Sequence, residues 1–146
     1  MLLAQDVDIN AQGGFYGNAL QAASCKGHEK IVQILLATDA DVNAQGGEYG
    51  NALQAASLGG HEKIVQMLLA KDADVNAHGG DFGKALQAAS YKGHEKIVQI
   101  LLATDADVNA QGGYFGSALQ AASFGGHEKI VQILLAKDAD VNAQGG

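Results

Sequence analysis

The sequence contains no proline, no tryptophan and no arginine, and these absences narrow what the chain can be. All nine basic residues are lysine, so it lacks the side chain that makes bidentate contacts with bases and phosphates. Sixteen Asp and Glu residues give a formal net charge of -7, which argues against binding to a nucleic-acid backbone. We therefore expect no nucleic-acid partner.

Long apolar runs and paired cysteines are also missing. No run approaches the roughly 20 apolar residues of a membrane-spanning helix, so we expect no membrane partner. Residues 1–4 are followed at once by Asp6 and Asp8, and no signal peptide is visible. The single cysteine, Cys25, excludes an intramolecular disulfide and fits a reducing compartment, which favours a cytoplasmic location.

The chain has instead a strict internal repeat. A 33-residue unit at 14–46 recurs at 47–79, 80–112 and 113–146, the last with a terminal glycine added, and 1–13 match the end of the same unit. A fixed period of this length is typical of solenoid proteins, in which each unit contacts only its neighbours. We therefore expect a single array over the whole chain.

Each unit carries the pattern of two short helices. In the first unit, Asn18 can cap a helix over 19–24, and Gly27 interrupts the chain. A second helix is predicted from about 28 to 38, with a wide apolar stripe, and Asp39 follows where a left-handed residue usually ends a helix. Because such a pair cannot bury its apolar side alone, the units should stack into an all-α solenoid with an aliphatic core.

These motifs resemble ankyrin repeats. The segments ALQAAS, GHEKIVQILL and DADVNA are similar to the family patterns T-P-L-H-x-A-A, G-H-x-x-I-V-x-x-L-L and G-A-D-V-N-A, in register through four units. The resemblance implies an ankyrin solenoid of helix-turn-helix units joined by turn or hairpin loops. The form GGxYGNALQAAS resembles the ankyrin arrays of fungal NACHT-type receptor-like proteins.

The units depart from the family pattern at the first helix and at the end of the second. Gln replaces the family's His, and Asp replaces the Gly that closes the second helix. Where the family has Thr, the four units have Asn, Asn, Lys and Ser. Because a lysine side chain cannot accept a capping hydrogen bond, the departure at Lys84 should leave its helix without a side-chain cap.

Eight of the 33 columns vary between units, and all eight Phe and Tyr residues fall in three of them. The resemblance implies that these columns, at the turn tips and first-helix ends, line the concave face that contacts partners. Aromatic side chains dominate binding hot spots, so we predict a shallow aromatic strip flanked by acidic residues and lysines. The candidate partner-binding residues are Phe15, Tyr16, Cys25, Lys26, Glu48, Tyr49, Leu58, Asp81, Phe82, Lys84, Tyr91, Lys92, Tyr114, Phe115, Ser117 and Phe124.

Two alternatives remain open at this point. The column that is always aromatic can pack turn against turn instead of binding a partner. Other columns alternate with a 66-residue period, as in Lys26, Gly59, Lys92 and Gly125, which either tandem duplication or design from a consensus would produce.

No motif predicts catalysis, a cofactor or a metal site. His28 recurs once per unit, and stacked units lie on the order of 10 Å apart, too far to share a metal ion. We expect these histidines to bond to loop backbone instead. The sequence from Asp39 to Asn43 matches the first half of a calcium loop, but the required Gly and Glu are missing. Ser24 has no triad partners, and Cys25 is expected to be an inert thiol.

The sequence thus predicts a non-enzymatic protein-recognition scaffold whose partner it does not identify. The alternative is a structural rod without a dedicated partner. The chain starts inside a second helix at Leu2 and Leu3, and the apolar stripe at 130–135 has no successor. We expect a piece of a longer array or an array without caps, whose ends could stack head-to-tail.

Overall fold

The computed structural model describes residues 8–137. Eight α-helices lie within these residues, paired at the 33-residue spacing of the repeat. They are α1 (Ala19–Lys26), α2 (Glu29–Ala37), α3 (Ala52–Gly59), α4 (Glu62–Ala70), α5 (Ala85–Lys92), α6 (Glu95–Ala103), α7 (Ala118–Gly125) and α8 (Glu128–Ala136). The helix expected to end at Leu2 and Leu3 falls outside the described residues.

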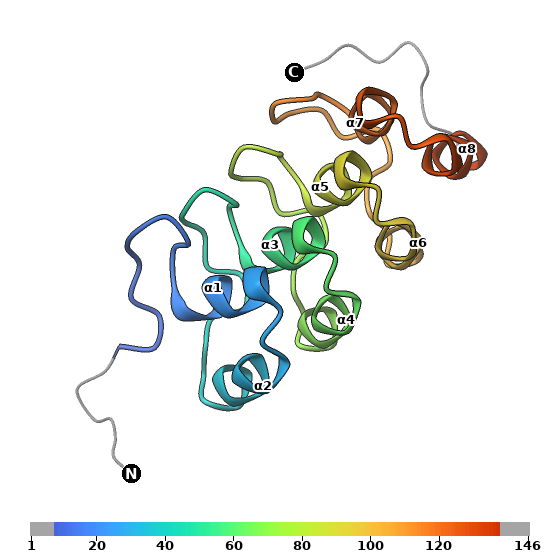
Figure 1. Ribbon diagram of the computed structural model, residues 1–146. Coiled ribbons are helices and arrows are strands. Elements are labelled where there is room, and N and C mark those ends of the chain that lie inside the picture. Colours follow the sequence, from blue (N-terminus) through green and yellow to red (C-terminus); the bar gives the residue numbers. More distant parts are fainter. Residues whose placement is uncertain (1–7, 138–146) are drawn as a thin grey trace.

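The helices form two layers. The first helix of every pair lies in one row and the second helix in the other, and the turns between units extend from the first-helix row, away from the second (Figure 1). Helices in each row pack against the equivalent helices of the adjacent units. The predicted all-α solenoid is confirmed. The only β-bridges in the described range, Gly13–Gly17 and Gly79–Gly83, are isolated and sit in turns.

Local sequence explains where the first helices begin. The Oδ1 atom of Asn18 accepts from the Gln21 backbone amide at 2.8 Å, and the Gln21 side chain in turn accepts from the Asn18 amide. Asn51 and Ser117 cap their helices from the same position. Lys84 makes no side-chain cap bond, as predicted. Each helix starts with a satisfied amide wherever the capping column carries an acceptor.

Left-handed residues end both helices of a pair. Gly27 has a φ of 81° after α1, which extends two residues beyond the predicted end at 24. After the second helices, Asp39, Asp72 and Asp105 have φ values of 67°, 68° and 67°. The expected left-handed closure is therefore present, although Asp takes this conformation less easily than Gly.

The core is aliphatic. Leu53, Ile64, Val65 and Leu68 are fully or almost fully buried, and the equivalent residues of the other units extend this core along the array. No aromatic side chain among residues 8–137 belongs to it. The aromatic residues are therefore free to lie elsewhere, and stability rests on close packing of Ala, Leu, Ile and Val.

Side chains of invariant columns tie each unit to the next. Gln54 Nε2 donates to the carbonyls of Gly79 and Gly83, at 2.7 and 2.6 Å, in the following turn. His94 Nε2 lies 2.9 Å from the Leu58 carbonyl, so this histidine column does contact backbone, but in the last turn of the preceding first helix and not in a loop as expected. Equivalent bonds recur in other units, so these columns hold the turns and helices of adjacent units in register.

Candidate partner-binding surface

The turn tips form an aligned row. The backbone amide of Glu48 donates to the Phe15 carbonyl at 2.8 Å, Asp81 donates to Glu48 at 3.2 Å, and Tyr114 donates to Asp81 at 2.7 Å. Gly80 permits this close approach, because its φ is 68° and a Cβ there would lie 2.7 Å from the backbone nitrogen of Gly50. Side chains of the most variable column are thus presented side by side.

At the N-terminal end, three aromatic side chains make one cluster, which we call the N-terminal aromatic cluster. Phe15 meets Tyr16 and Tyr49 edge-on, with ring centroids 4.9 and 5.5 Å apart. The ammonium group of Lys26, at the end of α1, lies 5.9 Å from the centroid of the Tyr16 ring. That distance is within the range of a cation–π contact and joins the first-helix end to the turn tip.

The other five aromatic residues form the C-terminal aromatic cluster, comprising Phe82, Tyr91, Tyr114, Phe115 and Phe124. The Tyr91 ring, at the end of α5, stacks on Phe115 at 4.3 Å and on Phe82 at 5.7 Å. Phe124, at the end of α7, lies 4.9 Å from Phe115, while Tyr114 stands perpendicular to Phe115. Helix ends and turn tips therefore meet on one surface, which we call the aromatic face.

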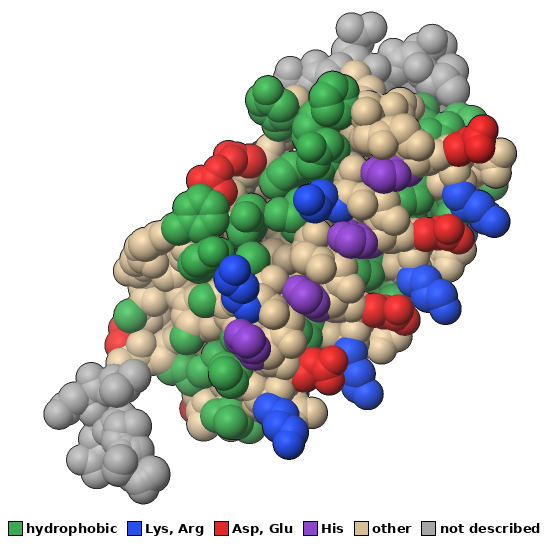
Figure 2. Space-filling view, in the orientation of Figure 1, with side chains coloured by type: hydrophobic (Ala, Val, Ile, Leu, Met, Phe, Trp, Pro, Cys, Tyr) green, Lys and Arg blue, Asp and Glu red, His purple; other side chains and the backbone are tan. Residues whose placement is uncertain are grey.

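Figure 2 shows hydrophobic side chains gathered over this part of the first-helix row, with acidic side chains beside them. The histidines run as a diagonal row between the aromatic face and the second helices, where lysines and acidic residues alternate (Figure 2). Within the C-terminal aromatic cluster lies a shallow pocket of about 260 Å³, lined by Asp81, Phe82, Tyr91, Tyr114 and Phe115.

Two carboxylates lie beside each other at the edge of the aromatic face. The neighbouring Asp81 side chain raises the pKa of Glu48 above its ordinary value of 4.5, because a protonated Glu48 can donate a hydrogen bond to Asp81 and an ionised Glu48 is repelled by its like charge. Glu48 and Asp81 lie between Phe15 and Tyr114 in the row of turn tips, so they place negative charge between the two aromatic clusters.

Burial affects the titration of one thiol and one phenol on this surface. Burial raises the pKa of the Cys25 thiol, and this effect exceeds the opposing influence of Lys26. Burial also raises the pKa of Tyr49. A thiol with a raised pKa carries little thiolate at neutral pH, which fits the inert thiol predicted for Cys25.

Most of the candidate partner-binding residues are accessible, but to different degrees. Phe15, Tyr114 and Phe124 are 51%, 81% and 71% exposed. The charged side chains of Lys26, Asp81 and Lys92 are also exposed. Nine are half-buried, namely Tyr16, Cys25, Glu48, Tyr49, Leu58, Phe82, Lys84, Tyr91 and Phe115.

Ser117 corrects the prediction. Its side chain is 2% exposed and accepts from the Gln120 amide as the cap of α7, so it cannot reach a partner. Lys84 is also engaged, since its Nζ atom donates to the Asn76 carbonyl at 2.6 Å. Three of the four residues in this column cap a first helix, a role that variability alone did not distinguish from binding.

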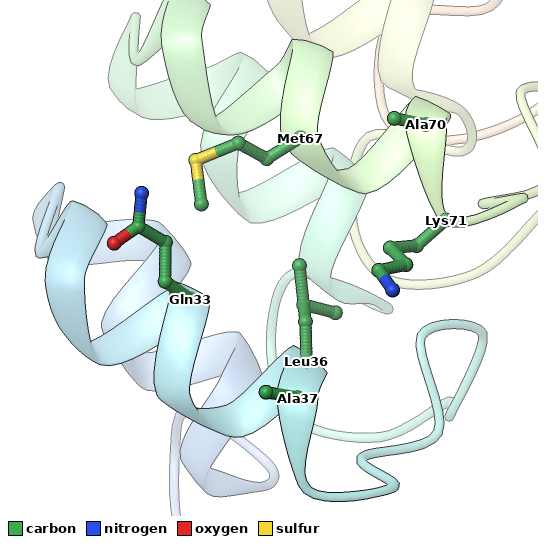
Figure 3. A pocket seen from close by; sticks show the side chains of 6 residues that line it. All are labelled: Gln33, Leu36, Ala37, Met67, Ala70 and Lys71. Carbon is green, nitrogen blue, oxygen red and sulfur yellow. The ribbon is translucent and has the colours of Figure 1, made fainter.

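A second hollow, which sequence reasoning did not select, lies in the other layer. A pocket of about 280 Å³ between α2 and α4 is lined by Gln33, Leu36, Ala37, Met67, Ala70 and Lys71. Leu36 and Met67 point into the space between the two helices (Figure 3). Met67 and Lys71 both occupy variable columns, and that variation was the available signal.

We also searched the described residues for a metal site and for a membrane-spanning helix. Among residues 8–137 no group of three or more His, Cys, Asp or Glu side chains is placed to hold a metal ion. In the same range no helix is long and apolar enough to cross a bilayer.

Comparison with known proteins places this geometry in a family. The family described as ankyrin repeats (3 copies) matches residues 1–79 and again residues 77–145. Over 27 residues, 18% of this chain, the sequence is 70% identical to the azaphilone pigments biosynthesis cluster protein L of Monascus ruber. The matched part is only 6% of that protein's length. Because the family match extends over nearly all of the sequence and the paired helices stack at its 33-residue period, the chain belongs to the ankyrin repeat family.

Proposed function

We propose that the chain is a non-enzymatic recognition scaffold that binds a protein partner through its aromatic face. Ankyrin repeats generally mediate protein–protein interaction. The observation that carries the proposal is the convergence of the variable aromatic columns: helix ends and turn tips from different units meet on one surface.

The energetics of the surface support this role. Tyr114 and Phe124 are large apolar side chains left in water, and covering them would release free energy without opening the core. Their backbones are held by helix α7 and by the row of linked turn tips. A rigid surface loses little conformational entropy when a partner docks. A sensor or adaptor segment, the role suggested by the fungal resemblance, would use such a surface.

The test compares partner binding by two variants, one with substitutions on the aromatic face and one with substitutions on the second helices. The immobilised chain captures proteins from a lysate, and a captured protein counts as a partner only when it rebinds in purified form. We expect the double variant Tyr114→Ala/Phe124→Ala to weaken that binding roughly 10- to 30-fold, the scale of hot-spot residues.

A matched control comes from the second helices. Ile34 and Leu135 are exposed large apolar residues of α2 and α8, so Ile34→Ala/Leu135→Ala removes comparable area from the other layer. This control should bind the purified partner with unchanged affinity. Equal weakening by both variants, with unchanged melting temperatures, would remove the aromatic face as the binding site.

One observation favours the structural alternative. Ile34 is 62% exposed on α2 and Leu135 is 42% exposed on α8, whereas Leu102, equivalent to Leu135, is buried inside the array at 9%. These exposed surfaces match contacts made between units, so molecules could stack head-to-tail. Sedimentation should then show association that Ile34→Glu abolishes. Monomers over a wide concentration range would eliminate this alternative and leave partner recognition untouched.

A further inference from the structure

The pocket in the C-terminal aromatic cluster has a distinctive chemistry. Its lining consists of four aromatic rings and one carboxylate, that of Asp81. Its volume of about 260 Å³ is below the roughly 300–1,000 Å³ of small-molecule sites. A pocket of this size fits one side chain of a docking partner.

The ring geometry favours a planar guest. Phe82, Tyr91 and Phe115 lie nearly parallel, with interplanar angles of 21° to 27°. Tyr114 stands at 90° to Phe115 and forms a wall across them. A flat group that lies parallel to the three stacked rings would extend the stack, and guanidinium is the planar cationic group among protein side chains.

The charge of the site favours a cation. The Asp81 carboxylate lines the pocket, and Glu48 is its neighbour in the row of turn tips, where the Asp81 amide donates to the Glu48 carbonyl. No lysine is among the residues that line the pocket, and the nearby Lys84 is bonded to the Asn76 carbonyl. In the N-terminal aromatic cluster the Lys26 ammonium lies over the Tyr16 ring, whereas the residues that line the pocket of the C-terminal aromatic cluster include no cation.

We propose that this pocket binds an arginine side chain of the protein partner, with the guanidinium stacked on the aromatic rings and paired with Asp81. A carboxylate accepts two parallel N–H bonds from a guanidinium, which a lysine ammonium cannot offer in that geometry. The proposal rests on the recognition function above and specifies the side chain that the aromatic face recognises in its partner.

The test uses blocked tripeptides with a central arginine, lysine or citrulline, titrated into the isotope-labelled full chain and followed by NMR. Citrulline keeps the shape of arginine but is neutral. We expect arginine to shift the amide signals of the pocket residues, and to bind more tightly than lysine or citrulline by roughly threefold to tenfold.

Two variants and one control locate the binding. Asp81→Asn removes the charge at constant size, and Tyr114→Leu keeps apolar area but removes the ring; each should weaken arginine binding roughly threefold to tenfold. Phe15→Leu changes the same column as Tyr114 in another unit, outside the pocket, and should leave binding unchanged. Tyr114 and Phe15 are both exposed, so both leucine variants should fold.

Binding of citrulline or lysine as tight as that of arginine would overturn the proposal, as would variants without effect. The arginine pocket and the partner-binding role of the aromatic face give different results when they are wrong. A chain that ignores the arginine peptide but loses its purified partner in the Tyr114→Ala/Phe124→Ala variant keeps its recognition function and loses only the arginine pocket. If the chain binds the peptide but the Tyr114→Ala/Phe124→Ala variant still binds the partner at full strength, the aromatic face is not the surface that binds the partner.

Discussion

The side chains of Ser24, Ser57 and Ser90 are fully buried, and their hydroxyl groups have no hydrogen-bond partner. A buried hydroxyl without a partner loses its hydration and gains nothing in return. The same column in the last unit, Ser123, is exposed, so its hydroxyl stays in water. The same repeat position is therefore buried in one unit and exposed in another, so Ser123 can serve as a control for Ser57.

Replacing Ser57 with Ala should raise the free energy of unfolding by about 1 kcal/mol, because it removes the unpaired group and improves helix propensity. Urea denaturation measures the difference. Ser123→Ala should change stability by no more than about 0.5 kcal/mol. If the two variants are stabilised equally, burial of the hydroxyl has no cost and the explanation is wrong.

The pair formed by Glu48 and Asp81 predicts a pH dependence. Since the pKa of Glu48 is raised in the folded chain, its ionisation opposes folding, and this penalty is present at neutral pH and absent once pH falls below 4.5. Glu48→Gln should therefore raise the melting temperature slightly at pH 7 and leave it unchanged near pH 3. A benefit that persists in acid would contradict repulsion as its cause.

Individual helices differ in how well they begin. Asn18, Asn51 and Ser117 cap α1, α3 and α7, whereas α5 starts at Lys84 with no side-chain cap. The chain thus compares a capped and an uncapped version of almost the same helix. A missing cap leaves an early amide of the helix without its side-chain acceptor.

Lys84→Asn should stabilise the array by about 0.5–1 kcal/mol, the gain from a new cap less the lost bond to the Asn76 carbonyl. Chemical denaturation measures the change, and Asn18→Ala should show the opposite sign. Stability unchanged by Lys84→Asn would mean that the α5 cap is already satisfied in another way.

At the level of elements, the sequence was sufficient for the fold. The 33-residue period, the helix caps and the left-handed residues Asp39, Asp72 and Asp105 at the ends of second helices could be predicted from the sequence, because each depends on residues close together in the chain. The contact partners of the aromatic rings were not, since Tyr91 meets Phe82 and Phe115 only after the units stack. Ser117 was misjudged because variation does not distinguish a cap from a contact residue.

For the whole molecule, stability depends on hydrogen bonds between adjacent units. The Gln54 side chain spans two carbonyls of the next turn, while the Gln120 side chain accepts from the Ser117 amide within its own unit. Removing the first should therefore uncouple neighbours, whereas removing the second, among the bonds between residues 8–137, loses only the one at the α7 cap.

Gln54→Leu should destabilise the array by about 1–3 kcal/mol, because it leaves the Gly79 carbonyl without its donor and takes one of two donors from the Gly83 carbonyl. Gln120→Leu should cost about 1 kcal/mol or less. Denaturation monitored by hydrogen exchange resolves whether the first variant also lowers protection across the α3–α5 boundary. Equal costs for both variants would contradict coupling through this column.

The most direct test of recognition through the aromatic face is photo-cross-linking with a benzophenone side chain placed at one position at a time. Position 124 lies on the aromatic face at the end of α7, and exposed position 132 lies on α8 in the other layer. The account predicts that the purified partner cross-links from position 124 and not from position 132. Cross-linking from position 132 alone would contradict it.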